Sequence, residues 1–120
     1  MITIIQKKFG KTVGYFRNSL EETSDLPFPV ENSCLIPSKL MRKFISKLSS
    51  LIFCSRDNGY YDSYKGYSTC RICNEIVGSD EYAIKVKDKF FIVPEGYLHY
   101  IEKHNIQPDM DLFNSVMNQH

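Results

Sequence analysis

The chain has no tryptophan, no long apolar run, no internal repeat and almost no net charge. Its 15 Lys and Arg residues nearly balance its 14 Asp and Glu residues, so the formal net charge at pH 7 is +1. That balance by itself favours neither an acidic nor a basic partner. No segment approaches the ~20 apolar residues that span a bilayer, and the opening residues lack the cleavage site of a secretory signal peptide. These absences predict a cytoplasmic protein that does not bind a membrane.

The residues that are present suffice for one hydrophobic core. The chain has 120 residues, of which 42% are hydrophobic and 13% are aromatic, as expected for one globular domain. We therefore predict a small single domain of the α+β class over residues 1–120. A domain of this size without tryptophan gains stability from an additional cross-link, such as a bound metal ion.

Residues 1–56 are predicted to form a hairpin, a loop and a basic helix. β-Branched and aromatic residues around two glycines predict two short strands or a ragged hairpin over residues 2–17. Three prolines and four acidic residues predict an extended loop over residues 21–37. Apolar residues at helical spacing then predict an amphipathic helix over about residues 38–52. The apolar residues of this helix are Leu40, Met41, Phe44, Ile45, Leu48, Leu51 and Ile52.

Residues 64–106 are predicted to form a cysteine-containing turn, a β-hairpin and a helix, after a tyrosine-rich link. The segment "EYAIKVKDKFFIV" has two short apolar runs on either side of a charged turn, which is typical of a hairpin. Pro94 suits the first position of a helix over about residues 95–104, and Asn105 and Pro108 suit its end. The remainder, residues 107–120, is predicted to form a short helix whose inward residues are Met110, Phe113 and Met117.

Two of the four cysteines and two of the three histidines have the spacing of metal ligands. Cys70 and Cys73 are separated by two residues, and His99 and His104 by four. Zinc binds four such ligands tetrahedrally, and two cysteines with two histidines are one of its standard structural sets. The 25 residues between Cys73 and His99 are about twice the ~12–15 of a standard finger. We therefore predict one structural Zn²⁺ ion in a treble-clef-like unit or an enlarged finger.

The positions of the two histidines on the predicted helix add a geometric condition. Residues five apart lie roughly 140° apart around an ideal α-helix. His99 and His104 can therefore share a metal ion only if the last helical turn loosens. The stop signals at Asn105 and Pro108 place the helix end where this loosening is needed. We predict that His104 is the last helical residue or the first residue beyond the end.

Three other interpretations of these four residues are open on sequence alone. The cysteines could be a reduced, empty pair beside unrelated histidines, since histidine is often a partly buried polar residue. They could be a redox pair, although such a pair usually follows a strand at a helix N-terminus. The metal could also be catalytic, with Glu102 as a base. Four protein ligands leave no open position, however, and the chain has no His-Glu-x-x-His motif.

The predicted basic helix and the tyrosines that follow it form a second candidate site. The cations could contact phosphates or an acidic partner, although a solvated helix face has the same pattern. The tyrosines could stack on bases, or could cover the side of a small core. Cys34 and Cys54 lack partner spacing and are interpreted as small buried hydrophobic residues. The candidate contact residues are Lys39, Arg42, Lys43, Lys47, Tyr61 and Tyr64.

The segments "YKGYSTCRICN" and "VPEGYLHYIEKHNIQP" resemble a family of small uncharacterised proteins, most of them bacterial. That family has a Leu-Pro-x-Pro segment, a helix, a Tyr-x-Gly-x-Ser-x-Cys-Arg-x-Cys turn, then Trp-Pro-Glu-Gly-x-x-His-Tyr and a second histidine. Val93 stands in place of the tryptophan, and the segment 74–89 is longer than in the family, which weakens any inference about a shared binding surface. The resemblance implies the same metal ligands but supplies no activity. The matching positions are Leu26–Pro29, Tyr64–Cys73, Val93–Tyr100 and His104.

The predicted function is that of a non-enzymatic protein-interaction module, of the adaptor or inhibitor type. The metal site is filled by protein ligands, and the chain shows no nucleophile–base pair at a recognisable spacing. A nucleic-acid-binding protein that uses the basic helix and the tyrosines is the second hypothesis. A zinc hydrolase or thiol enzyme is the third. The first hypothesis requires a partner protein and the second a nucleic acid.

Overall fold

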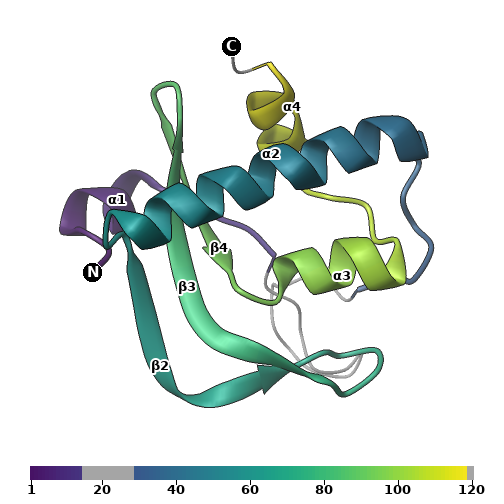
Figure 1. Ribbon diagram of the computed structural model, residues 1–120, viewed down its shortest axis with the longest axis horizontal. Coiled ribbons are helices and arrows are strands. Elements are labelled where there is room, and N and C mark those ends of the chain that lie inside the picture. Colours follow the sequence, from purple (N-terminus) through teal and green to yellow (C-terminus); the bar gives the residue numbers. More distant parts are fainter. Residues whose placement is uncertain (15–28, 119–120) are drawn as a thin grey trace.

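A four-stranded mixed sheet organises the fold in a computed structural model, which describes residues 1–14 and 29–118 (Figure 1). The strand order is β1-β4-β3-β2, with the first pair parallel and the other two antiparallel. The predicted α+β class is confirmed. The strands are β1 (Lys11–Thr12), β2 (Tyr61–Thr69), β3 (Ile76–Val86) and β4 (Lys89–Pro94), and the helices are α1 (Ile4–Phe9), α2 (Ser38–Asp57), α3 (Tyr97–His104) and α4 (Met110–Met117).

The predicted hairpin in the second half is formed by β3 and β4. Their register pairs Ala83 with Ile92, and Lys87 adopts a left-handed φ of 55° in the turn. β2 pairs with the other side of β3, with an irregularity between Ser63 and Ser68. The segment predicted as a tyrosine-rich link is therefore mostly a strand, because its tyrosines and threonine favour extended structure.

The N-terminal hairpin is a wrong prediction for residues 1–14. The chain forms the helix α1 there, and β1 then joins the sheet parallel to β4. A capping box begins α1: the Thr3 hydroxyl accepts a hydrogen bond from the Gln6 backbone N–H, and the Gln6 side chain accepts one from the Thr3 backbone N–H. This exchange satisfies two backbone donors near the helix start, which outweighs the strand preference of the β-branched residues. Residues 15–17 of the predicted hairpin lie outside the described residues.

The predicted amphipathic helix is present and longer than expected, since α2 ends at Asp57. It crosses one side of the sheet (Figure 1). Phe44 is fully buried and packs against Phe113 of α4, with ring centroids 5.0 Å apart. Leu40, predicted to belong to the apolar face, is instead 42% exposed. Neither α2 nor any other helix within the described residues is long and apolar enough to cross a membrane.

Two short helices complete the described chain after β4. Pro94 is the last residue of β4 rather than the first of a helix, and α3 starts at Tyr97. The predicted final helix is present as α4, but Met110 is 42% exposed and does not point inward. Phe113 is buried and Met117 packs, partly buried, against the core, as predicted. The other buried residues of α4 are Leu112 and Val116.

Candidate metal centre

The structure brings the four predicted metal ligands together from two separate elements. Cys70 and Cys73 lie in the turn between β2 and β3, and His99 and His104 lie on α3. One ligand atom from each residue is within 4.8 Å of the corresponding atoms of the other three. The Cys73 Sγ lies 3.4 Å from the His99 Nε2. We call these four residues the Cys/His cluster.

Backbone hydrogen bonds fold the cysteine turn so that both sulfurs face inward. The Cys70 N–H donates to the Glu75 carbonyl at 2.8 Å, and the Asn74 N–H donates to the Cys70 carbonyl at 2.9 Å. Asn74 adopts a left-handed φ of 63°, which asparagine tolerates better than most residues. The Ile72 N–H points at the Cys70 Sγ, at 3.4 Å. A thiolate ligand gains from such a donor, because the N–H offsets part of its negative charge.

The end of α3 loosens at the position that the sequence predicted. His104 is the last residue of the helix, and Asn105 follows in the left-handed conformation, with φ 51° and ψ 46°. The Asn105 and Ile106 N–H groups both point at the Tyr100 carbonyl, so the chain makes a wider turn than the regular i→i−4 pattern. This widening turns His104 toward His99, and their ring centroids are 5.2 Å apart. The prediction about His104 is confirmed.

Each histidine has a carboxylate next to its other ring nitrogen. The Glu31 Oε2 lies 2.6 Å from the His104 Nδ1, and the Glu75 Oε2 lies 3.8 Å from the His99 Nδ1. The hydrogen bond with Glu31 raises the pKa of His104, whereas burial lowers the pKa of His99. A carboxylate hydrogen-bonded to the other ring nitrogen, as Glu31 is, fixes the ring orientation of a metal-binding histidine and makes it a better ligand. Glu75 is too far from His99 for such a bond and accepts one from the Lys103 ammonium at 2.9 Å instead. The arrangement leaves the Nε2 atom of each ring for the centre of the cluster.

The sequence interpretation missed both carboxylates. Glu75 follows Cys73 by two residues, so its proximity to the turn could have suggested a role. Glu31 lies 73 residues before His104, in a segment predicted as an acidic loop. Its backbone neighbour Asn32 donates to the His104 carbonyl at 2.9 Å, and this contact depends on the tertiary fold. The sequence contains no local signal for such a contact.

The residues of the cluster fit a metal ion with two sulfur and two nitrogen ligands. His104 is 5% exposed, and its Nε2 atom has no hydrogen-bond partner among the described residues. A buried polar atom without a partner costs roughly 1–3 kcal/mol, and a metal ion bound at this atom would remove that cost. Cys70 and Cys73 form no disulfide, and Cys70 is fully buried. Two thiolates and two imidazoles are a donor set that suits tetrahedral zinc.

Two further carboxylates, on the wall of a separate cavity, accept hydrogen bonds from the protein itself. A cavity of about 570 Å³ opens beside Arg71 and Tyr100, and Asp80 and Glu95 lie on its wall. The Glu95 carboxylate accepts hydrogen bonds from the Ser79 and Asp80 N–H groups, both at 3.2 Å. The Asp80 carboxylate accepts from Ser63 and Arg56. Glu102, the base of the catalytic alternative, is exposed on α3 and is not one of the clustered residues.

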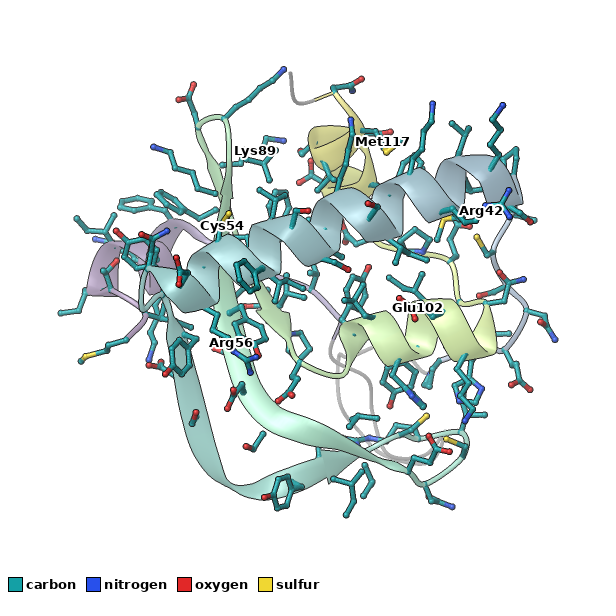
Figure 2. The ribbon with its side chains drawn as sticks, in the orientation of Figure 1. Arg42, Cys54, Arg56, Lys89, Glu102 and Met117 are labelled. Carbon is teal, nitrogen blue, oxygen red and sulfur yellow. The ribbon has the colours of Figure 1, made fainter. Side chains whose placement is uncertain are left out.

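The structure does not join the predicted partner contacts into one surface. The cations form what we call the basic ridge, exposed along the N-terminal half of α2, and none of them has an ion pair with a described residue. Tyr61 is half-buried and packs near Tyr82 at the start of β2, beside the other end of the helix. Arg42 and Arg56 mark these two ends in Figure 2. The side chain of Tyr64 lies outside the described residues. The basic ridge consists of Lys39, Arg42, Lys43 and Lys47.

The other two cysteines differ from their prediction in part. Cys34 is half-buried, and its thiol lies 3.9 Å from the Ile36 carbonyl. Cys54 is exposed on α2 (Figure 2), so its interpretation as a buried hydrophobic residue is wrong. It lines an open cavity beside Ala83 and Phe90, whereas its neighbour Ser55 is buried and donates its hydroxyl to the Ala83 carbonyl at 2.6 Å.

Comparisons of this chain with protein-family models, with curated proteins and with solved structures found no match.

Proposed function

We propose that Cys70, Cys73, His99 and His104 bind one structural zinc ion. The observation that carries this proposal is the convergence of four ligand atoms within 4.8 Å, one of them a buried imidazole nitrogen without a hydrogen-bond partner among the described residues. Four protein ligands complete the coordination that zinc adopts in structural sites. The resemblance to the bacterial family with the same cysteine and histidine pattern supports this choice of ligands.

A zinc ion at this position would link three segments that share little apolar contact. The cysteine turn and the end of α3 provide the ligands, and Glu31 ties the segment before α2 to His104. Apparent binding free energies of structural zinc are on the order of 10 kcal/mol. Binding of this strength would stabilise the segments around the cluster, where the buried apolar residues are few.

We further propose that the protein is a non-enzymatic interaction module of the adaptor or inhibitor type. The closed ligand set supports this proposal, since a catalytic zinc keeps one position for water or substrate. The structural hydrogen bonds of Asp80 and Glu95 support it too. The four cations of the basic ridge, which form no ion pair with a described residue, give the module a surface for an acidic partner.

The zinc proposal is tested on the purified full chain, prepared without added metal. We expect one zinc per chain by elemental analysis, and replacement by cobalt should give the spectrum of a tetrahedral site with two sulfur ligands. Cys70→Ser should lose the metal and lower the melting temperature, whereas Cys54→Ser, at an exposed cysteine, should change neither. A wild-type chain without metal, whose melting is unchanged by Cys70→Ser, would contradict the proposal.

Binding to nucleic acid is the second candidate, and the exposed cations of α2 are the observation in its favour. Neutralisation of phosphates makes such binding fall steeply with salt concentration. Retention of single-stranded DNA or RNA that decreases with salt, and decreases further when Lys43 and Lys47 are changed to Gln, would favour this candidate over a protein partner. Failure to retain either nucleic acid at low salt would exclude it.

A further inference from the structure

Tyr100 lies between the two elements that carry the Cys/His cluster. It belongs to α3, and its ring centroid is 6.1 Å from that of His99 and 6.5 Å from that of His104. Its hydroxyl reaches the cysteine turn, where it accepts a hydrogen bond from the Arg71 N–H at 2.8 Å. The side chain is 5% exposed and packs in the same small apolar group as Cys70. A single buried side chain therefore joins the turn to the helix.

The Tyr100 hydroxyl is also hydrogen-bonded to the side chain of Cys70. A thiolate that binds a metal ion has no proton to donate, so the hydroxyl is the donor in this bond once the metal is present. The Arg71 N–H donates to the oxygen of the same hydroxyl, and hydrogen bonds in such a chain strengthen one another. Together with the Ile72 N–H, at 3.4 Å, the hydroxyl gives the Cys70 sulfur a second donor.

The sulfur of Cys73 has different surroundings. It lies 3.4 Å from the His99 Nε2 and is hydrogen-bonded to His104, so both of its neighbours are ligands of the same cluster. No hydrogen bond from a backbone N–H or a hydroxyl to this sulfur is present within residues 1–14 and 29–118. Cys73 is half-buried, whereas Cys70 is fully buried. Because a buried charge is costly without donors, Cys70 is the thiolate that depends on its surroundings.

We propose that Tyr100 is the positioning residue of the metal centre, and that its hydroxyl holds Cys70 in place as a ligand while it ties the cysteine turn to α3. This inference deepens the zinc proposal and rests on it. Loss of the hydroxyl lowers the metal affinity, because the turn and the sulfur are then less well fixed for the ion. A hydrogen bond to a metal-bound sulfur also withdraws electron density from it, so its removal changes the light absorption of the metal–sulfur bond.

Tyr97 offers a matched control on the same helix. Its hydroxyl accepts a hydrogen bond from the Asp109 N–H at 2.9 Å, and its side chain is 2% exposed. It packs in the larger apolar cluster with Phe44 and Leu112. Phenylalanine in place of either tyrosine removes one oxygen and leaves one backbone N–H without its acceptor. The two changes are chemically the same, and only the one at Tyr100 touches the cysteine turn.

The test compares the full-length wild type with Tyr100→Phe and Tyr97→Phe. Competition with a chromophoric chelator should show a zinc affinity about 10–100-fold lower in Tyr100→Phe and unchanged in Tyr97→Phe. In the cobalt-substituted protein, the sulfur-to-cobalt charge-transfer band should move to longer wavelength in Tyr100→Phe alone. Urea denaturation should show a lower midpoint for Tyr97→Phe with and without metal. Both variants should fold, because phenylalanine keeps the ring that packs in each cluster.

The other outcomes separate the failure of this proposal from that of the zinc site. A zinc affinity and a cobalt spectrum that Tyr100→Phe leaves unchanged would overturn the role of Tyr100. Equal losses of affinity in both variants would also overturn it, since they would reflect a general loss of stability. A lower affinity with an unchanged cobalt spectrum would contradict the action on Cys70. A wild type that binds neither zinc nor cobalt would end the zinc proposal itself, and the role of Tyr100 with it.

Discussion

The two ends of this molecule are each stabilised by a different kind of interaction. In the sheet-and-helix core, α2 and α4 pack on β3 and β4, and 13 buried apolar residues form one cluster. Around the Cys/His cluster, the corresponding apolar group contains three buried residues, Cys70, Tyr100 and Ile106. Polar contacts and the Cys/His cluster replace apolar packing there. The comparison teaches that this small domain has one core made by the hydrophobic effect and a second region, poor in apolar contacts, in which four residues lie close enough to hold a metal ion.

Metal removal should destabilise the region around the Cys/His cluster and leave the sheet-and-helix core folded. This is the largest change in stability that we expect. Because zinc binding contributes on the order of 10 kcal/mol in structural sites, a strong chelator should open the cysteine turn and the end of α3. The Cys70 and Ile106 amides donate hydrogen bonds within that region of the folded protein, so their hydrogen exchange should become faster. The Ala83 amide in the sheet should stay protected. Simultaneous loss of protection at all three amides would mean that the core cannot fold without the metal.

A cavity in the core should lower the free energy of unfolding whether or not the metal is bound. Phe44→Ala removes a fully buried ring and should lower the free energy of unfolding by about 3 to 5 kcal/mol. We expect this loss in urea denaturation both with metal and with chelator. Phe53→Ala, at a ring that is 68% exposed, is the control and should change the midpoint little. A loss confined to the metal-bound protein would contradict the independence of the core.

Loss of a carboxylate beside a histidine should weaken the metal site without touching the core. Glu31→Gln keeps the size of the side chain but removes the charge next to the His104 Nδ1. Such changes typically cost 10–100-fold in metal affinity, which competition with a chromophoric chelator measures. Glu102→Gln, on the exposed side of α3, should leave the affinity unchanged. Equal metal affinities for the wild type and Glu31→Gln would show that Glu31 does not strengthen metal binding at His104.

The smallest expected effect lies at α1, which belongs to neither end. Thr3→Ala removes the capping hydroxyl that accepts from the Gln6 N–H, and loss of such a cap costs about 1 kcal/mol. We expect a slightly lower midpoint in urea with no change in metal content. Thr3→Ser, which retains the hydroxyl, should restore most of the difference. An unchanged midpoint for Thr3→Ala would mean that α1 frays independently of the rest.

The comparison also explains which parts of the structure were predictable. The Cys/His cluster and the loosened end at His104 follow from spacing along one helix and one turn, so local rules were enough. The β3–β4 hairpin and α2 follow from apolar periodicity. The position of Glu31 and the exposure of Leu40 and Met110 depend on which segments meet in three dimensions, and the sequence pattern contains no information on that.

The N-terminal error has a different cause. The same residues that favour strands by composition also contain the Thr3 and Gln6 capping box, and the local hydrogen bonds of the box outweighed the intrinsic preference. β1 is a strand of two residues that owes its conformation to β4. Such a short strand gives no periodic signal, because periodicity needs several residues to be recognised.

The parallel pairing of β1 with β4 has a consequence for how the chain acquires its structure. Lys11 pairs with Phe91, so the sheet closes across one of the longest sequence separations in the domain, and His104 of the Cys/His cluster lies still further along. Contacts of this kind form slowly because a long loop must close before they contribute. During synthesis, residues 11–12 can therefore join the sheet only after the β4 segment has also been made. Ile2 packs with Ala83 and Ile92 in the finished fold, so its side chain stays exposed to water until then. A chaperone would therefore be most useful in this interval.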